Sequence, residues 1–275
     1  MLPLEVMIPS GTPGVGVPLA ILFTLVAIAF AAGWVDAVVG GGGLIQLPSL
    51  MIMLPDSTPP PYILSTNKLS SAAGTLIATV TYLRRVRLKW ATVLPLIGCA
   101  FAGSALGSSL ARYLPKAWMT PIVLVAIIAV GIYTVRKPNL GLEHRELHSG
   151  AAHIVRVCLI GLVIGFYDGA LGPGTGSFFV IAIVALLGYG FLQATAYAKV
   201  ANLTTNVASI LVFGFHGEVL WLLGGCMAAA NLTGGLIGAR MALRFGNRFI
   251  RRVFLVVITI LAVRLSYDTY HQFFG

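Results

Sequence analysis

The alternation of long apolar runs and short polar breaks indicates a chain built from membrane-spanning helices. A helix needs about 20 apolar residues to cross a bilayer, and runs near that length recur along the whole sequence. They cover residues 17–39, 66–83, 91–111, 117–135, 153–172, 192–213, 219–239 and 250–270. Two shorter apolar runs, 44–55 and 175–189, are left over. The pattern predicts an all-α polytopic membrane protein.

Each short run directly follows a glycine-rich break in a long apolar run. The glycines of the first break are Gly40, Gly41, Gly42 and Gly43, and those of the second are Gly172, Gly174 and Gly176. An aspartate, Asp36 or Asp168, precedes each break by one helical turn. A carboxylate and an interrupted helix are both costly at membrane depth. Their combination in both halves predicts Gly-broken helices that line a substrate pathway.

The two halves carry matching residues in the same order and at a nearly constant spacing. Lys68, Trp90, Gly103 and Gly107 of the first half correspond to Lys199, Trp221, Gly234 and Gly238 of the second. We predict two transmembrane repeats, 1–137 and 153–275, joined by a polar cytoplasmic linker, 138–152. The glycine pairs have the spacing of helix packing rather than of a site.

The charges select between two interpretations of the short runs. Re-entrant segments would give eight spans, whereas crossing segments would give ten. Most of the 18 lysines and arginines fall in or beside 84–89, 136–152 and 240–252. Only the ten-segment count brings these three regions to one face, as the positive-inside rule requires. Five segments per half is an odd number, so we predict about ten segments as two inverted five-segment repeats.

Composition excludes several other classes of protein. With 58% hydrophobic residues, 9% charged residues and a mean hydropathy of +0.94, the chain leaves no room for an ordinary soluble domain. The net charge of +10 follows the loops and forms no basic stripe for nucleic acid. The His-containing stretch 143–148 lacks the order of a metalloprotease motif. We expect no metal and no cofactor. The stretch from Pro55 to Pro61 predicts a stiff, non-helical loop.

The glycine breaks are the candidate binding site. Successive glycines before a helix start can turn their N–H groups toward an anion. Asn67 and Lys68 in one half, and Lys199 and Asn202 in the other, place cationic and amide groups near them. Lys68 could instead extend to the membrane interface. We predict a pocket for a small anion formed by these four residues and both breaks. Asp36 and Asp168 remain candidates for ion coupling or for organising the glycine loops.

Four segments of the sequence resemble the TauE/SafE family of sulfite and organosulfonate exporters. They are Gly33–Gly43, Asn67–Gly74, Gly165–Gly176 and Lys199–Asn206, and the resemblance runs over essentially the whole chain. It implies a multi-pass carrier of the bacterial inner (cell) membrane for small oxyanions such as sulfite, thiosulfate or two-carbon sulfonates, in either direction. The second break reads Gly-Pro-Gly-Thr-Gly where the first has four glycines, so the halves need not contribute equally.

The favoured hypothesis is a secondary transporter for a small anion, with the lipid bilayer as its other partner and a homodimer left open. A passive anion channel is the nearest rival. A membrane enzyme or assembly factor is the rival from another class, and the lack of a recognisable catalytic cluster in the sequence counts against it. The sequence does not name the substrate or the direction of transport.

Overall fold

The computed structural model describes residues 17–55, 57–111 and 147–274, with isolated positions between 112 and 146. Within these ranges the chain forms helices joined by short turns, with no strand. The helices are α1 (Leu19–Val39), α2 (Gly43–Met53), α3 (Pro60–Leu83), α4 (Trp90–Ala111), α6 (Gly150–Ala170), α7 (Thr175–Leu187), α8 (Phe191–Phe215) and α9 (Trp221–Phe274). The prediction of an all-α protein is confirmed. Five of the described helices are long and apolar enough to cross a membrane, namely α1, α4, α6, α8 and α9.

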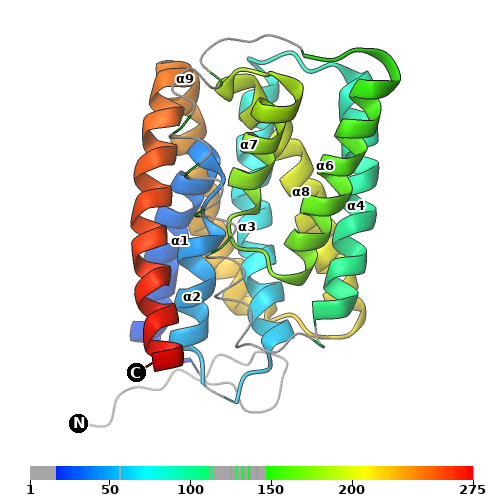
Figure 1. The fold of residues 1–275 in the computed structure, drawn as a ribbon. Coiled ribbons are helices and arrows are strands. Elements are labelled where there is room, and N and C mark those ends of the chain that lie inside the picture. Colours follow the sequence, from blue (N-terminus) through cyan, green and yellow to red (C-terminus); the bar gives the residue numbers. More distant parts are fainter. Residues whose placement is uncertain are drawn as a thin grey trace, which may run out of the picture.

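Helix α9 consists of two helical segments that fold back on each other. Gly246 lies between them with φ 68° and ψ −161°, outside the helical region. Figure 1 shows the segment before Gly246 rising to one end of the bundle and the segment after it descending to the C-terminus. This turn separates the two runs, 219–239 and 250–270, that the sequence predicts as different spans.

Helix α3 begins earlier than the sequence predicts. Its first residues are Pro60 and Pro61, with Pro59 as the N-terminal cap. A proline in the first helical turn loses no hydrogen bond, because the N–H groups there have no helical acceptor. The expected non-helical loop therefore ends at Pro59, and the prediction for Pro60 and Pro61 was wrong.

Two helical hairpins enter the bundle from opposite ends, and their bends meet inside it. The outer ends of α1 and α2 lie at the end that holds the C-terminus, whereas those of α6 and α7 lie at the other end (Figure 1). At that other end the amide of Leu147, just before α6, donates to the carbonyl of Leu187 at the end of α7. The two glycine breaks are the bends of these hairpins, so the fold brings them together.

The remaining long helices hold the hairpins by close backbone contact. A β-carbon added at Gly103 on α4 would lie 2.3 Å from the carbonyl oxygen of Leu162 on α6. One added at Gly234 on α9 would lie 2.0 Å from the carbonyl oxygen of Phe30 on α1. The same holds for Gly107 against Phe166 and for Gly238 against Trp34. The assignment of these glycine pairs to helix packing is confirmed.

The cationic segments that the structure describes lie at a single end of the bundle. The turn 84–89 after α3, the start of α6 and the bend at Gly246 are all at the end opposite the C-terminus (Figure 1). The predicted span 117–135 and most of the linker 138–152 lie outside the described residues.

Candidate functional site

The two glycine breaks cross each other in direct backbone contact. Helix α1 ends at Val39 and is capped by Gly40, which has a φ of 84° and donates its amide to the carbonyl of Asp36. The carbonyl of Gly40 accepts a hydrogen bond from the amide of Ser177 at 3.1 Å. A β-carbon added at Gly176 would lie 2.5 Å from the α-carbon of Gly40. Only glycine allows the start of α7 to pass this close to the end of α1.

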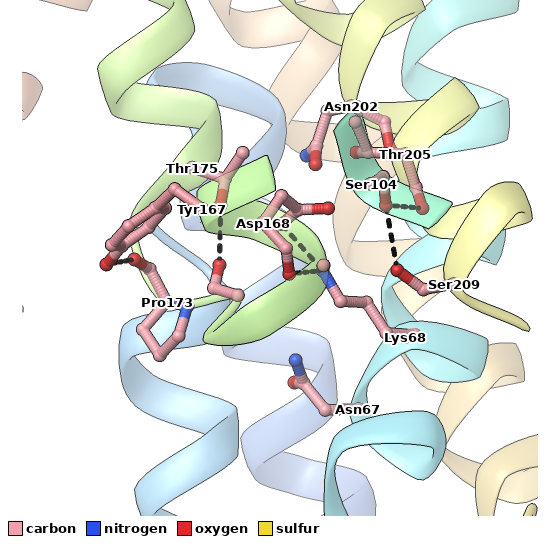
Figure 2. Close-up of polar contacts among 12 residues, drawn as sticks. Asn67, Lys68, Ser104, Tyr167, Asp168, Pro173, Thr175, Asn202, Thr205 and Ser209 are labelled. Carbon is pink, nitrogen blue, oxygen red and sulfur yellow. Dashed lines mark hydrogen bonds and ion pairs between the residues drawn. The ribbon is translucent and has the colours of Figure 1, made fainter. Parts of the chain in front are cut away.

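Two lysines contact the inner ends of α1 and α6, next to the bends of the hairpins. Each lysine belongs to one half of the chain and binds an aspartate of the other half. Lys68 on α3 lies 2.6 Å from Oδ1 of Asp168 at the end of α6 and donates to its carbonyl at 2.7 Å. Figure 2 shows this side chain extended from α3 toward Asp168. Lys199 on α8 lies 2.8 Å from Oδ2 of Asp36 and also bonds the carbonyl of Asp36. Each of the two ion pairs therefore joins one half of the chain to the other.

The position of each lysine follows from the chemistry of a helix end. The last turn of a helix carries the negative end of the helix dipole, and many of its carbonyls lack a helical donor or can accept a second bond, as that of Asp36 does beside its bond from Gly40. Asp36 and Asp168 lie in the last turns of α1 and α6. An ammonium group can satisfy both the carbonyl and the carboxylate of such a residue. Both lysines are buried, and neither extends to an interface, so the structure excludes the interfacial reading of Lys68.

A small cavity lies between the breaks, with room for about one water molecule at about 10 Å³. Its lining includes most of the residues that the sequence singles out: Asp36, Gly40, Gly43, Asn67, Lys68, Asp168, Gly172, Gly174, Gly176 and Asn202. In Figure 2 Asn67 and Asn202 lie on opposite sides of the pair formed by Lys68 and Asp168. The fold thus gathers residues from six helices, α1, α2, α3, α6, α7 and α8, and from both breaks around one cavity.

Three of the sequence candidates lie outside this lining. Gly42 packs against α1, where an added β-carbon would lie 2.4 Å from the carbonyl oxygen of Ala32. Gly41 is next to the side chain of Val257 on α9. Lys199 lies behind Asp36 and contacts the cavity through that carboxylate.

The carboxylates meet lysines rather than the amides of the glycine breaks. Oδ2 of Asp36 accepts from Lys199 and, at 3.3 Å, from Thr75. Oδ2 of Asp168 is buried without a hydrogen-bond partner. The four charged groups at this site, Asp36, Lys68, Asp168 and Lys199, sum to zero charge. Among the described residues, no three His, Cys, Asp or Glu side chains gather as metal ligands would.

The second break is held by its own side chains. The hydroxyl of Tyr167 donates to the carbonyl of Pro173 at 2.7 Å, and the hydroxyl of Thr175 donates to that of Gly172 at 2.8 Å (Figure 2). Gly172 and Gly174 adopt φ values of 89° and 80°, which glycine adopts without strain. The break is therefore a defined turn that fixes the direction of α7.

A buried amide network beside the cavity escaped the sequence analysis. The Gln46 amide on α2 donates to Oδ1 of Asn67 at 3.0 Å, and its oxygen accepts from Asn231 on α9 and Ser70 on α3 at 2.9 and 3.1 Å. Asn67 itself lines the cavity. Gln46 and Asn231 are isolated amides inside the apolar runs 44–55 and 219–239, and this was the available signal.

These features define a multi-pass helical membrane protein with a charged, glycine-lined site inside the bundle. The family model of the sulfite exporter TauE/SafE matches residues 25–265. The chain belongs to this family, as the resemblance of the glycine and Asn-Lys segments predicts.

Curated relatives support the same class. A probable membrane transporter protein, ORF9, of Sinorhizobium is 38% identical over 91% of this chain and 94% of its own length. A probable membrane transporter protein of Haemophilus influenzae is 36% identical over 91% and 95%, and YfcA of Escherichia coli, also a probable membrane transporter protein, is 33% identical over 92% of each chain. No solved structure significantly matches the chain.

Proposed function

We propose that this protein is a secondary transporter for a small anion and that the crossing of its two glycine breaks is the substrate site. The single observation that carries the proposal is that both buried ion pairs, Lys68 with Asp168 and Lys199 with Asp36, connect one half of the chain to the other. A site built from both halves can open to one end or the other when the halves move. In transporters with internal repeats, alternating access arises when one repeat moves against the other around a site at their interface.

The proposal includes two inverted five-segment repeats, 1–137 and 153–275, joined by the linker 138–152 and forming about ten membrane segments. Three observations support it. The hairpins enter from opposite ends (Figure 1). The two ion pairs are equivalent, because each joins a lysine of one half to the aspartate of the other. The glycine contacts of α4 with α6 and of α9 with α1 are equivalent in the same way. The cationic segments then face the cytoplasm, and the membrane is the bacterial inner membrane.

The chemistry of the site suits an anion with several oxygens. Gly43, Thr175 and Gly176, in the first turns of α2 and α7, line the cavity. The first amides of a helix lack helical acceptors and lie at the positive end of its dipole. Lys68 and Asn202, which line the same cavity, add an ammonium and an amide as further hydrogen-bond donors. Sulfite, thiosulfate and small sulfonates are the proposed substrates, in keeping with the description of the family.

In this structure both lysines are paired with carboxylates, so a substrate anion must compete with Asp36 and Asp168 for the ammonium groups. The cavity holds about one water molecule, and substrate entry requires the hairpins to separate. Protonation of Asp168 would weaken its hold on Lys68 and leave the ammonium for the anion. Oδ2 of Asp168, which has no partner, can take that proton without breaking a bond. This route would couple anion transport to protons.

The rival functions differ in what they predict for flux. A passive anion channel lets the anion equilibrate and does not accumulate it. A membrane enzyme or assembly factor would move no anion. The inter-half ion pairs favour a transporter, because a buried, neutral and closed site is unsuited to a continuous pore.

The test is anion flux in proteoliposomes. Radiolabelled sulfite, thiosulfate, taurine and isethionate are offered with and without an imposed pH gradient. We expect saturable accumulation of at least one of them above its external concentration when the gradient is present. The matched control is the charge-balanced double variant Lys68→Met with Asp168→Asn, for which accumulation should disappear. Uptake that only equilibrates would indicate a channel, and no flux of any anion by folded protein would refute the proposal.

A further inference from the structure

A second cavity, separate from the site between the breaks, opens at the cationic end of the bundle. It has a volume of about 680 Å³ and lies where α3 ends, α8 begins and α9 approaches its bend. This volume is in the range of cavities that bind small organic ligands. Neither glycine break contributes to its lining.

The walls and the rim of this cavity differ in chemistry. Its walls include half-buried aliphatic side chains, Ile77, Val80, Leu192, Leu236 and Leu243. Four exposed arginines also line it: Arg84 and Arg85 at the end of α3, and Arg240 and Arg244 on α9. None of the described residues that line the cavity carries a carboxylate. The cavity therefore combines an apolar interior with a concentrated positive charge.

We propose that this cavity binds an anionic phospholipid, with its phosphate on the arginines and part of an acyl chain against the aliphatic wall. Guanidinium groups bind phosphate oxygens in pairs, and a cluster of them is a strong phosphate site. Basic pockets between transmembrane helices on the cytoplasmic side are suited to anionic lipid head groups. A soluble anion would use the arginines alone and would leave the aliphatic wall in water.

The location fits a lipid from the inner leaflet. Arg84 caps the end of α3, and Arg240 and Arg244 lie shortly before the bend at Gly246, so the arginines are where helices leave the apolar layer. Ile77 lies about two helical turns deeper on α3, at the depth of an acyl chain. The cavity joins α3 to α9, which carry Lys68 and the buried Asn231, and a lipid there would brace helices that hold the site.

The experiment measures binding of phosphatidylglycerol to the full-length protein in detergent by native mass spectrometry, with phosphatidylcholine as the neutral comparison. The test variant is Arg240→Gln with Arg244→Gln. The matched control is Arg248→Gln with Arg252→Gln, two exposed arginines at the same end that do not line the cavity. We expect roughly tenfold weaker phosphatidylglycerol binding in the test variant and little change in the control.

A second variant tests the aliphatic wall. Leu236→Trp should fill part of the cavity and weaken phosphatidylglycerol binding while all four arginines remain. Inorganic phosphate, offered as a soluble competitor, should fail to displace the lipid at millimolar concentration. Equal losses in both arginine pairs, no preference for phosphatidylglycerol over phosphatidylcholine, or ready displacement by inorganic phosphate would each overturn the proposal.

Discussion

At the residue scale, the charge balance of the site depends on four side chains that pair across the two halves. Lys68 and Lys199 each bind a carboxylate and a helix-end carbonyl of one aspartate. Removing one partner of a buried pair leaves an uncompensated charge, which costs about 3–5 kcal/mol, whereas replacing both is often tolerated. Single and double substitutions at these positions therefore separate stability from function.

We expect Lys199→Met to destabilise the protein by about 3–5 kcal/mol, because it leaves the Asp36 carboxylate buried and unpaired. Adding Asp36→Asn should restore most of this loss, since both charges are then absent. Unfolding in detergent gives the stabilities. If Lys199→Met alone unfolds like the unchanged protein, the pair with Asp36 contributes little and the lysine is dispensable for the fold.

Asp168→Asn tests the proposed competition between carboxylate and anion for Lys68. With the competing charge removed, anion affinity should rise by about tenfold or more, which corresponds to at least 1.4 kcal/mol, and uptake should no longer respond to an imposed pH gradient. Isothermal titration and proteoliposome flux measure the two effects. Retained pH-gradient dependence in the folded variant would remove Asp168 from the coupling route. The groups facing Asp168 that could take over are Asp36 and Lys68.

At the element scale, the site depends on how closely α7 passes the end of α1. A β-carbon at Gly40 would lie 2.1 Å from the carbonyl carbon of Gly176, so neither backbone can move away without displacing a hairpin. The bond from the Ser177 hydroxyl to the carbonyl of Val39, at 2.8 Å, joins the same two elements. The crossing is therefore a close contact that sets the distance between the two breaks in this closed arrangement.

Gly176→Ala should destabilise the protein by about 1–3 kcal/mol and reduce transport, although alanine favours a helix by about 1 kcal/mol over glycine. The matched control is Gly225→Ala in α9, where an added β-carbon has open space and stability should stay the same or rise. Thermal unfolding and anion flux are measured for both. A Gly176→Ala protein as stable and active as the Gly225→Ala protein would mean that the breaks do not meet closely.

At the scale of the whole molecule, the bundle has one strongly cationic end. This end holds the turns after α3 and at Gly246, and the other end holds the turns between α2 and α3 and between α8 and α9 (Figure 1). Positive loops stay in the cytoplasm, so the charge distribution predicts an orientation for every described loop.

Single cysteines in a background without Cys99, Cys158 and Cys226 test this orientation. Ser57→Cys and His216→Cys should react with a membrane-impermeant maleimide in intact cells. Arg87→Cys and Arg248→Cys, at exposed positions of the cationic end, should react only after the membrane is opened. Labelling of Arg87→Cys and Arg248→Cys from opposite sides would rule out the two inverted five-segment repeats.

The sequence by itself determined the helices, their breaks and the family. These depend on local properties, since the length of an apolar run sets a span and glycine permits the turns at Gly40, Gly172 and Gly174. Most described helix ends agree with the predicted runs to within about three residues. One exception is Pro60, because a first-turn proline resembles a loop proline in sequence. The other is the segment 240–252, which was predicted as a break between spans but is helical on both sides of Gly246, because charged residues at the end of a span do not stop a helix. The gathering of Asn67, Lys68, Gly176 and Asn202 around one cavity also follows the expected pattern.

Only the tertiary structure decided which groups pair. Sequence placed each lysine beside a glycine break but could not show that Lys68 meets Asp168 and Lys199 meets Asp36, because that depends on how two distant hairpins interlock. The same interlocking pairs both lysines with aspartates, so the pocket that the sequence predicts to be cationic has no net charge. It also joined Gln46 to Asn231, two amides far apart in the chain. The partners of a buried charge are set by packing between helices, and packing is not encoded in any single segment.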